Sequence, residues 1–176
     1  MPSRDVSQPL PVTLRVATLD DAEAIRSIYN YEVENTTATM DLIPRSLDDQ
    51  REWLAARSGA FAAIVAVHTG SSGSELVGFA SLSPYKERAA YRPTVEDSVY
   101  VRRDCHGRGI GRLLLLHVLE LARTSGFHTV IARIEAGSTA SRTLHESCGF
   151  QLVGIEREVG RKFGRWLDSA IMQCLL

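Results

Sequence analysis

The sequence has little of what marks a membrane, secreted or nucleic-acid-binding protein. Its apolar runs at 61–67 and 113–116 are far too short to cross a bilayer. Residues 1–12 contain no apolar stretch that could serve as a signal peptide. The 20 lysines and arginines are balanced by 21 acidic residues, so the net charge is −1. No excess of positive charge favours nucleic acid or an anionic membrane as a partner.

Cysteine is also scarce, and the common nucleotide-binding and metal-binding signatures are missing. Cys105, Cys148 and Cys174 are odd in number and widely spaced, which argues against a disulfide framework and fits a cytoplasmic protein. No G-x-x-x-x-G-K-[ST] loop occurs, and Arg112 stands where a G-x-G-x-x-G fingerprint needs its third glycine. No histidine, cysteine or acidic residues have the spacing of metal ligands, so we expect no metal.

What the chain does contain is enough for one folded domain. Its 176 residues are 44% hydrophobic, which can supply a core. Residues 1–12, rich in proline, serine and charge, predict a loose tail, and residues 13–176 predict a single domain. The expected strands cover 13–17, 61–67, 76–85, 94–103, 128–136, 151–160 and 166–176, and the expected helices 18–35, 46–59, 110–125 and 138–149. Because this order mixes hairpins with crossovers, we expect the α/β class, with a mixed central sheet and helices on both faces.

Local signals predict where the helices begin and end. Thr18 and Ser46 can cap two helices whose first turns are acidic. Gly59, Gly126 and Gly149 follow helical patterns, so we expect three helices to end at these positions.

A glycine-rich, basic segment joins the strand at 94–103 to the helix at 110–125. Gly107, Gly109 and Gly111 allow a sharp turn and a close approach of a ligand to backbone N–H groups. The first N–H groups of the helix lack internal partners and the helix dipole makes that end positive, so the junction predicts a phosphate-binding site. Positive charge is added by Arg102, Arg103, Arg108 and Arg112, against one acidic residue, Asp104. The alternative is a plain turn that carries exposed arginines.

The segment H-G-R-G-I-G at 106–111 resembles the R/Q-x-x-G-x-G/A signature of the GNAT acetyltransferases, with His106 in the place of the usual Gln or Arg. The expected order of strands and helices also matches the GNAT fold over residues 13–176. The resemblance implies that the pyrophosphate of acetyl-CoA binds at this junction. It implies contacts with the cofactor at Val99, Tyr100, Val101, Gly107, Arg108, Gly109, Ile110, Gly111, Arg112, Ser138 and Ser147.

Four further blocks resemble one branch of that family, the phosphinothricin and methionine sulfoximine N-acetyltransferases. They are "IYNYEVENTTATMD", "AYRPTVEDSVYV", "LHESCGF" and "VGRKFGRWLD", which begin at residues 28, 90, 144 and 159. The branch implies acetylation of a small amino-acid-like amine, as in herbicide or antibiotic resistance, and a homodimer with its site close to the interface. Ser138 stands where the branch usually has an asparagine, so we expect a weaker contact with the cofactor there.

An amine must lose a proton before it attacks a thioester, so the reaction needs a general base. The resemblance places Glu96 beside the thioester, and partial burial would raise its pKa toward a useful value. The alternative is an outward-facing strand carboxylate. Asp97 follows Glu96 and should point to the opposite face. The branch resemblance implies that His145 contacts the substrate or the developing oxyanion, and that a backbone N–H within 99–101 stabilises that charge.

The acidic groups of the acceptor need cations. The branch resemblance puts substrate contacts at Lys86, Arg88 and Tyr91, because arginine can hold a carboxylate or phosphinate through two hydrogen bonds. Met40 falls where the branch has another bulky residue, so the pocket shape is expected to differ. The alternative for residues 85–92 is a solvated charged loop.

A second basic, aromatic stretch lies near the end of the chain. Lys162 and Phe163 are candidates to line the site, whereas Trp166 is expected to pack. Cys105 and Cys148 lack a neighbouring histidine and orienting group, which argues against an acyl-cysteine intermediate. Two other functions stay open: a GNAT enzyme for another amine, such as a polyamine or a protein N-terminus, and a CoA-binding sensor without catalysis.

Overall fold

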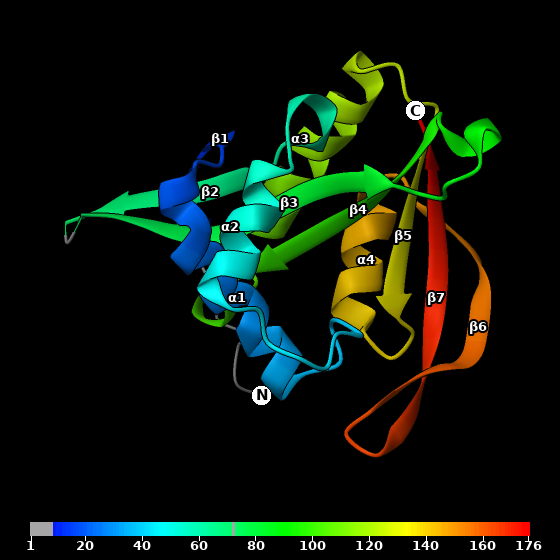
Figure 1. Ribbon diagram of the computed structural model, residues 1–176. Coiled ribbons are helices and arrows are strands. Elements are labelled where there is room, and N and C mark those ends of the chain that lie inside the picture. Colours follow the sequence, from blue (N-terminus) through cyan, green and yellow to red (C-terminus); the bar gives the residue numbers. More distant parts are fainter. Residues whose placement is uncertain (1–8, 72) are drawn as a thin grey trace, which may run out of the picture.

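The computed structural model describes residues 9–71 and 73–176. The predicted order of strands and helices is confirmed, and short 3₁₀ turns are added between elements (Figure 1). The elements are β1 (Thr13–Val16), α1 (Ala22–Asn35), α2 (Leu47–Ala55), β2 (Ile64–Gly70), β3 (Gly73–Pro84), β4 (Thr94–Val101), α3 (Ile110–Thr124), β5 (Thr129–Glu135), α4 (Thr139–Ser147), β6 (Gln151–Lys162) and β7 (Arg165–Leu175).

A single seven-stranded sheet has the order β1-β2-β3-β4-β5-β7-β6. Of the described strand pairs, β4 and β5 run parallel and the others run antiparallel, as the expected mixed sheet requires. The hairpin of β2 and β3 is present as predicted. The parallel pair needs a crossover connection, which α3 supplies.

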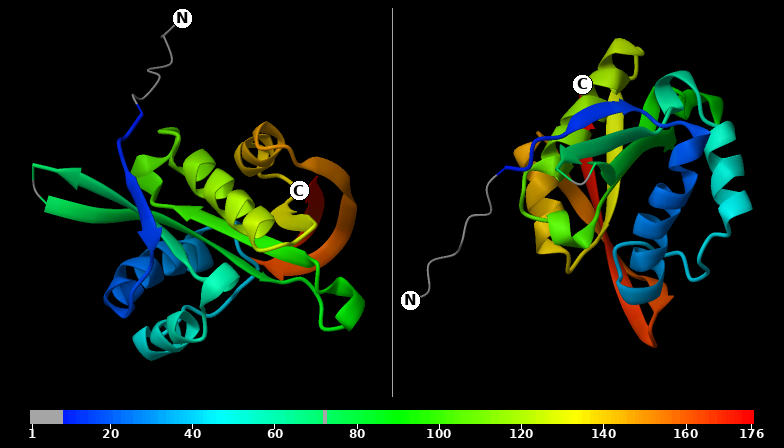
Figure 2. Two further views of the ribbon diagram at one scale, coloured as in Figure 1. Left: turned by 90° about the horizontal axis from the view of Figure 1, so that it is seen from above. Right: turned by 90° about the vertical axis from the view of Figure 1, so that its left-hand side faces the viewer.

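The sheet separates two apolar cores. On one face, α3 buries Leu114, Leu115 and Val118 against residues of β2, β3 and β4. On the other face, Ile25 of α1 and Phe79 of β3 are buried in a second core, which α1 and α2 cover. Figure 2 shows α3 on one side of the sheet and α1 and α2 on the opposite side. The α/β class with helices on both faces is therefore confirmed.

β4 and β5 remain paired over only a short distance. Their register joins Thr94 to Thr129, Val95 to Val130 and Glu96 to Ile131. Beyond Glu96 the two strands separate, and Figure 1 shows their C-terminal ends pointing apart. The rest of β4 pairs with β3 on one side and leaves its other edge without a neighbouring strand.

Several predicted helix ends need correction. Thr18 is the N-cap of a 3₁₀ turn at Leu19–Asp21, where the Asp21 carboxylate accepts the Thr18 N–H at 2.7 Å, and α1 begins after this turn at Ala22. Ser46 does cap α2, since its hydroxyl oxygen accepts the N–H of Asp49 at 3.1 Å.

Gly59 does not end α2, which stops at Ala55. Gly59, with a φ of 55°, instead begins a 3₁₀ turn at Gly59–Phe61. Because of this turn, β2 begins only at Ile64. Gly126 and Gly149 follow α3 and α4 with φ values of 82° and 97°, in the left-handed region that favours glycine at a helix end.

Most of the predicted tail, residues 1–8, lies outside the described residues. Residues 9–12 form no helix or strand, but Leu10 and Val12 pack against the α3 side of the core. The three cysteines form no disulfide in the described structure. No described helix has the length and apolar character needed to cross a membrane.

Candidate active site

The separation of β4 and β5 opens a cavity of about 930 Å³. It is lined from one side by the α3 N-terminus and α4, and from the other by the connection that follows α1. Among the residues predicted for the site, the structure brings together Met40, Glu96, Val99, Tyr100, Val101, Gly107, Gly109, Ile110, Gly111, Arg112, Ser138 and His145 on its walls.

The three glycines before and within α3 are present for different reasons. Gly107 and Gly109 have φ values of 75° and 83°, which only glycine adopts readily, and Gly109 caps α3. A Cβ on Gly111 would lie 3.1 Å from Leu144 Cδ2, so this glycine lets α3 approach α4. The N-terminal N–H groups of α3 therefore reach the cavity with little side-chain cover.

Much of the positive charge at this junction is already paired. Arg102 contacts Asp104 at 2.7 Å and Glu75 at 3.0 Å. Arg103 donates two hydrogen bonds to the buried Glu32 carboxylate, at 2.9 and 2.6 Å. Arg112 lines the cavity, and we infer that it is the arginine best placed to meet a phosphate.

Glu96 and Asp97 point to opposite faces of β4, as strand alternation requires. Glu96 lies on the α1 face, where its Oε2 is 3.3 Å from Nε of Arg133 on β5. Burial raises the pKa of Glu96, and the neighbouring Arg133 partly opposes that rise. Glu96 is thus a half-buried carboxylate at the cavity wall rather than an outward-facing one.

Asp97 faces α4 and forms a buried pair with His145. The His145 ring is about 4% exposed, and its Nε2 lies 3.1 Å from Asp97 Oδ2 while its Nδ1 lies 2.7 Å from the Ser141 carbonyl oxygen. Burial by itself lowers the pKa of His145, but Asp97 and the Ser141 carbonyl raise it overall. Because each nitrogen faces an acceptor, we assign the ring as an imidazolium that donates both protons.

Both ring nitrogens of His145 already have partners within the chain, although the residue lines the cavity. Its contact with a substrate or an oxyanion stays a prediction. Asp97 was given no role from the sequence, although it lines the cavity. A charged residue at an inward position of an apolar strand was the signal that could have identified it.

Of the residues predicted to contact the cofactor or the substrate, five do not line the cavity. Lys86, Arg88 and Tyr91 lie in the connection before β4, at the end of that strand opposite the α3 junction. Arg108 accepts the Leu10 N–H through its carbonyl oxygen. Ser147 is exposed on the last turn of α4, where its hydroxyl donates to the Leu144 carbonyl at 2.7 Å.

The connection between α1 and α2 covers the cavity on the Glu96 face. Lys162 was expected to line the site. Its ammonium group instead donates hydrogen bonds to the carbonyl oxygens of Thr39 at 2.9 Å and Glu32 at 3.3 Å, and so holds this connection in place. Burial lowers the pKa of Lys162. Met40 rests on Gly160, where an added Cβ would lie only 2.7 Å from the Met40 sulfur. The wall around Met40 therefore depends on a glycine in β6.

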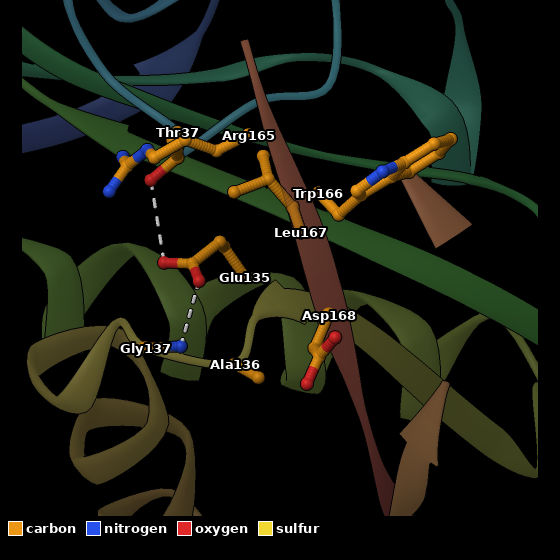
Figure 3. A pocket seen from close by; sticks show the side chains of 8 residues that line it. All are labelled: Thr37, Glu135, Ala136, Gly137, Arg165, Trp166, Leu167 and Asp168. Carbon is orange, nitrogen blue, oxygen red and sulfur yellow. Dashed lines mark hydrogen bonds between the residues drawn. The ribbon is translucent and has the colours of Figure 1, made fainter. Parts of the chain in front are cut away.

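A smaller hollow of about 400 Å³ adjoins the main cavity (Figure 3). Thr37 and Glu135 line both spaces, and the Thr37 hydroxyl donates to Glu135 at 3.4 Å. Trp166 borders the hollow with about 60% of its surface exposed, so the prediction that it packs is wrong for the single chain. Phe163 is exposed as well. Residues 9–71 and 73–176 contain no group of three or more potential metal ligands.

Comparison with known proteins was consistent across the whole domain. The family described as acetyltransferase (GNAT) domain matches residues 14–171. An L-methionine sulfoximine/L-methionine sulfone acetyltransferase of Pseudomonas aeruginosa is 40% identical over 164 residues, which cover 93% of this chain and 94% of the relative.

Two solved structures are similarly close. A ribosomal-protein-alanine N-acetyltransferase from Brucella melitensis is 42% identical with a TM-score of 0.88, over 93% of this chain and 99% of that chain. A GNAT superfamily phosphinothricin acetyltransferase from Sinorhizobium meliloti, in complex with acetyl-CoA, is 36% identical with a TM-score of 0.87, over 94% of this chain and 88% of that chain.

The buried pair of Asp97 and His145 generates a stability prediction. Replacing His145 by leucine leaves the Asp97 carboxylate buried without its partner, so the free energy of unfolding at pH 6 should fall by about 3–5 kcal/mol. The double variant Asp97→Val/His145→Leu should recover most of that loss, because no buried charge remains. Urea unfolding measures both values.

The same pair should depend on pH in a defined direction. The pKa of folded His145 is raised above its unfolded value, so the pair stabilises the fold fully below about pH 6.5 and loses this contribution as the pH rises through the folded pKa. The stability difference between wild type and the double variant should change over that window. A difference that is constant with pH would contradict the imidazolium assignment.

Proposed function

The chain belongs to the GNAT acetyltransferase family, and from that premise we propose that it transfers the acetyl group of acetyl-CoA to the amino group of a small amino-acid-like acceptor. It is an N-acetyltransferase, and the acceptor class is the proposed part. The observation that carries the proposal is one continuous cavity with an anion-binding helix N-terminus at one end and the Glu96 carboxylate on the opposite face of the sheet.

The residues at the α3 junction fit acetyl-CoA. Gly107, Gly109 and Gly111 keep side chains away from the N–H groups at the helix N-terminus, and Arg112 adds a cation at the same cavity wall. The unpaired edge of β4 over 99–101 offers backbone groups to the remainder of the cofactor. Acetyl-CoA supplies the thioester carbonyl that the amine attacks, and a β4 backbone N–H is the proposed donor to the oxygen that gains negative charge.

Glu96 is the proposed general base, directly or through a water molecule. A primary amine is mostly protonated at neutral pH, and the raised pKa of Glu96 makes it a better proton acceptor than an ordinary carboxylate. Cys105 also lines the cavity, but burial raises the pKa of its thiol and keeps it a weak nucleophile. Direct attack by the amine in a ternary complex therefore needs fewer assumptions than an acyl-cysteine intermediate.

His145 has an indirect part in this proposal. Its imidazolium sits at the cavity wall and is held by Asp97 and the Ser141 carbonyl. Because Asp97 balances the charge of the ring, the pair adds no net charge to the cavity wall, and its proposed part is to hold α4 against β4.

A protein N-terminus is the second candidate acceptor. The Brucella structure, whose printed name specifies a ribosomal-protein alanine, is 42% identical to this chain, against 40% for the methionine sulfoximine enzyme of Pseudomonas. Sequence similarity alone therefore does not separate a free amino acid from a peptide amine. A polyamine fits less well, because it has no acidic group to pair with a cation in the cavity.

The acceptor is tested by measuring acetyl-CoA-dependent thiol release. The panel contains L-methionine sulfoximine, L-phosphinothricin, a polyamine and a short peptide that begins with alanine. We expect kcat/KM for at least one of the two amino acids to exceed the peptide and polyamine values by at least 100-fold. A higher kcat/KM for the peptide would indicate that the acceptor is a protein N-terminus. Binding of acetyl-CoA without turnover of any amine would support a sensor.

Replacement of Glu96 by glutamine should separate catalysis from cofactor binding. We expect kcat to fall by about 10²–10⁴-fold, because the amide cannot accept a proton, while the Kd of acetyl-CoA stays within about twofold. The matched control is Glu120→Gln, since Glu120 lies on the exposed side of α3 and pairs with Arg123. An unchanged rate in Glu96→Gln would exclude Glu96 as the base.

We further infer that the enzyme is a homodimer joined through β6. This strand lies at one end of the sheet, so one of its edges has no neighbouring strand among the described residues. Large apolar side chains are exposed along it, namely Leu152, Val153, Ile155 and Val159. Open, apolar edge strands are normally covered by another chain or protected by charge.

The dimer is tested by sedimentation. Wild type should have twice the 19.4 kDa mass of one chain, and Val153→Glu should shift it toward the monomer because a charge would be buried at the interface. Leu116→Glu on the exposed side of α3 is the control and should leave the mass unchanged. A wild-type mass of one chain at micromolar concentration would contradict the inference.

A further inference from the structure

Arg133 was not singled out from the sequence, yet it occupies the acceptor side of the cavity. It extends from β5 between two carboxylates, with Nε 3.3 Å from Glu96 Oε2 and Nη1 3.0 Å from Glu156 Oε2. Its side chain is about 37% exposed and lines the cavity. Within the described part of the chain, Nη2 of Arg133 has no hydrogen-bond partner.

The other arginines and the lysine around the cavity either bind other groups of the chain or lie on the side proposed for the cofactor. Arg103 uses two of its nitrogens to bind the buried Glu32. Arg112 lies at the α3 N-terminus, on the side proposed for the cofactor phosphates. Lys162 donates to two backbone carbonyls beneath the α1–α2 connection. Among these described cations, Arg133 is the one that lies next to the candidate base.

The pair of Glu96 and Arg133 matches the charge pattern of an α-amino acid. The ammonium and carboxylate groups of such a molecule are attached to one carbon, so two opposite charges lie within a few ångströms of each other. Glu96 and Arg133 present the complementary charges 3.3 Å apart on the same cavity wall. An acceptor whose carboxylate contacts Arg133 would therefore hold its amine next to Glu96.

From this geometry we propose that Arg133 is a specificity-determining residue that binds the α-carboxylate of the acceptor. The assignment rests on the proposed acetylation of an amino-acid-like amine. A guanidinium forms charge-assisted hydrogen bonds with a carboxylate, and Nη2, which contacts neither Glu96 nor Glu156, supplies the donor for the incoming group. This assigns recognition of the acid group to β5, whereas the loop that holds Lys86 and Arg88 does not line the cavity of the single chain.

A competing explanation is that Arg133 only orients Glu96 and moderates its pKa. The two explanations predict different dependence on the acceptor. A residue that acts only through Glu96 should affect every amine equally. A residue that binds the carboxylate should affect acceptors that carry one and spare those that lack it.

The experiment compares L-methionine sulfoximine with its α-carboxamide, using Arg133→Gln. For the acid we expect kcat/KM to fall by about 10- to 100-fold, mostly through a higher KM, because a charge-assisted hydrogen bond is lost. For the carboxamide we expect a change below about threefold. The preference of wild type for the acid over the carboxamide should therefore collapse in the variant. Arg133→Lys, which keeps the charge, should restore part of that preference.

The controls separate the possible failures. Arg123→Gln, a matched change at an exposed position of α3, should keep the wild-type preference. Unfolding temperatures check that the variants fold. An equal loss for acid and carboxamide in Arg133→Gln, or no loss at all, overturns the assignment alone. If wild type turns over L-phosphinothricin and not L-methionine sulfoximine, phosphinothricin and its α-carboxamide are used for the same comparison. Wild-type turnover of neither amino acid overturns the proposed function and the assignment with it.

Discussion

β4 and β5 are hydrogen-bonded through only three residue pairs, the last of which joins Glu96 to Ile131, and then they separate. The site depends on this interruption of an otherwise continuous sheet. Where the strands separate, a single cavity extends through the sheet from one face to the other. It reaches both the α3 N-terminus and the α1–α2 connection. Neighbouring residues of one strand, Glu96 and Asp97, consequently line the same space from opposite faces.

Opening a sheet in its interior exposes polar groups, and buried ion pairs and hydrogen bonds stabilise the walls. The Asp97–His145 pair links β4 to α4, and the Glu32–Arg103 pair links α1 to the segment before the glycine-rich turn. Lys162 of β6 donates a hydrogen bond to the Thr39 carbonyl and so links the α1–α2 connection to the hairpin of β6 and β7. Each of these charges has a partner from a distant part of the chain, as low-dielectric surroundings require.

The glycines of the glycine-rich turn are required for two reasons, backbone conformation and the close packing of two helices. Gly107 and Gly109 are needed for backbone conformation, whereas Gly111 is needed because α4 packs close to α3. The segment that carries the N–H groups proposed to bind phosphate is therefore also the segment against which α4, with His145, packs at the cavity wall.

The sequence alone determined the order of strands and helices, the mixed sheet and the place of the glycine-rich turn, because apolar periodicity, caps and glycines act over a few residues. Through resemblance to a family it also predicted Glu96, which lies on the cavity wall. It could not place Lys86, Arg88 or Tyr91 relative to the cavity, and it missed Asp97 and Arg133. Those positions depend on contacts between residues far apart in the chain: Asp97 meets His145 across 48 positions, and Glu96 meets Arg133 across the parting strands. Only the tertiary structure decides which charged side chains face each other, because that choice follows from how strands and helices pack and not from local pattern.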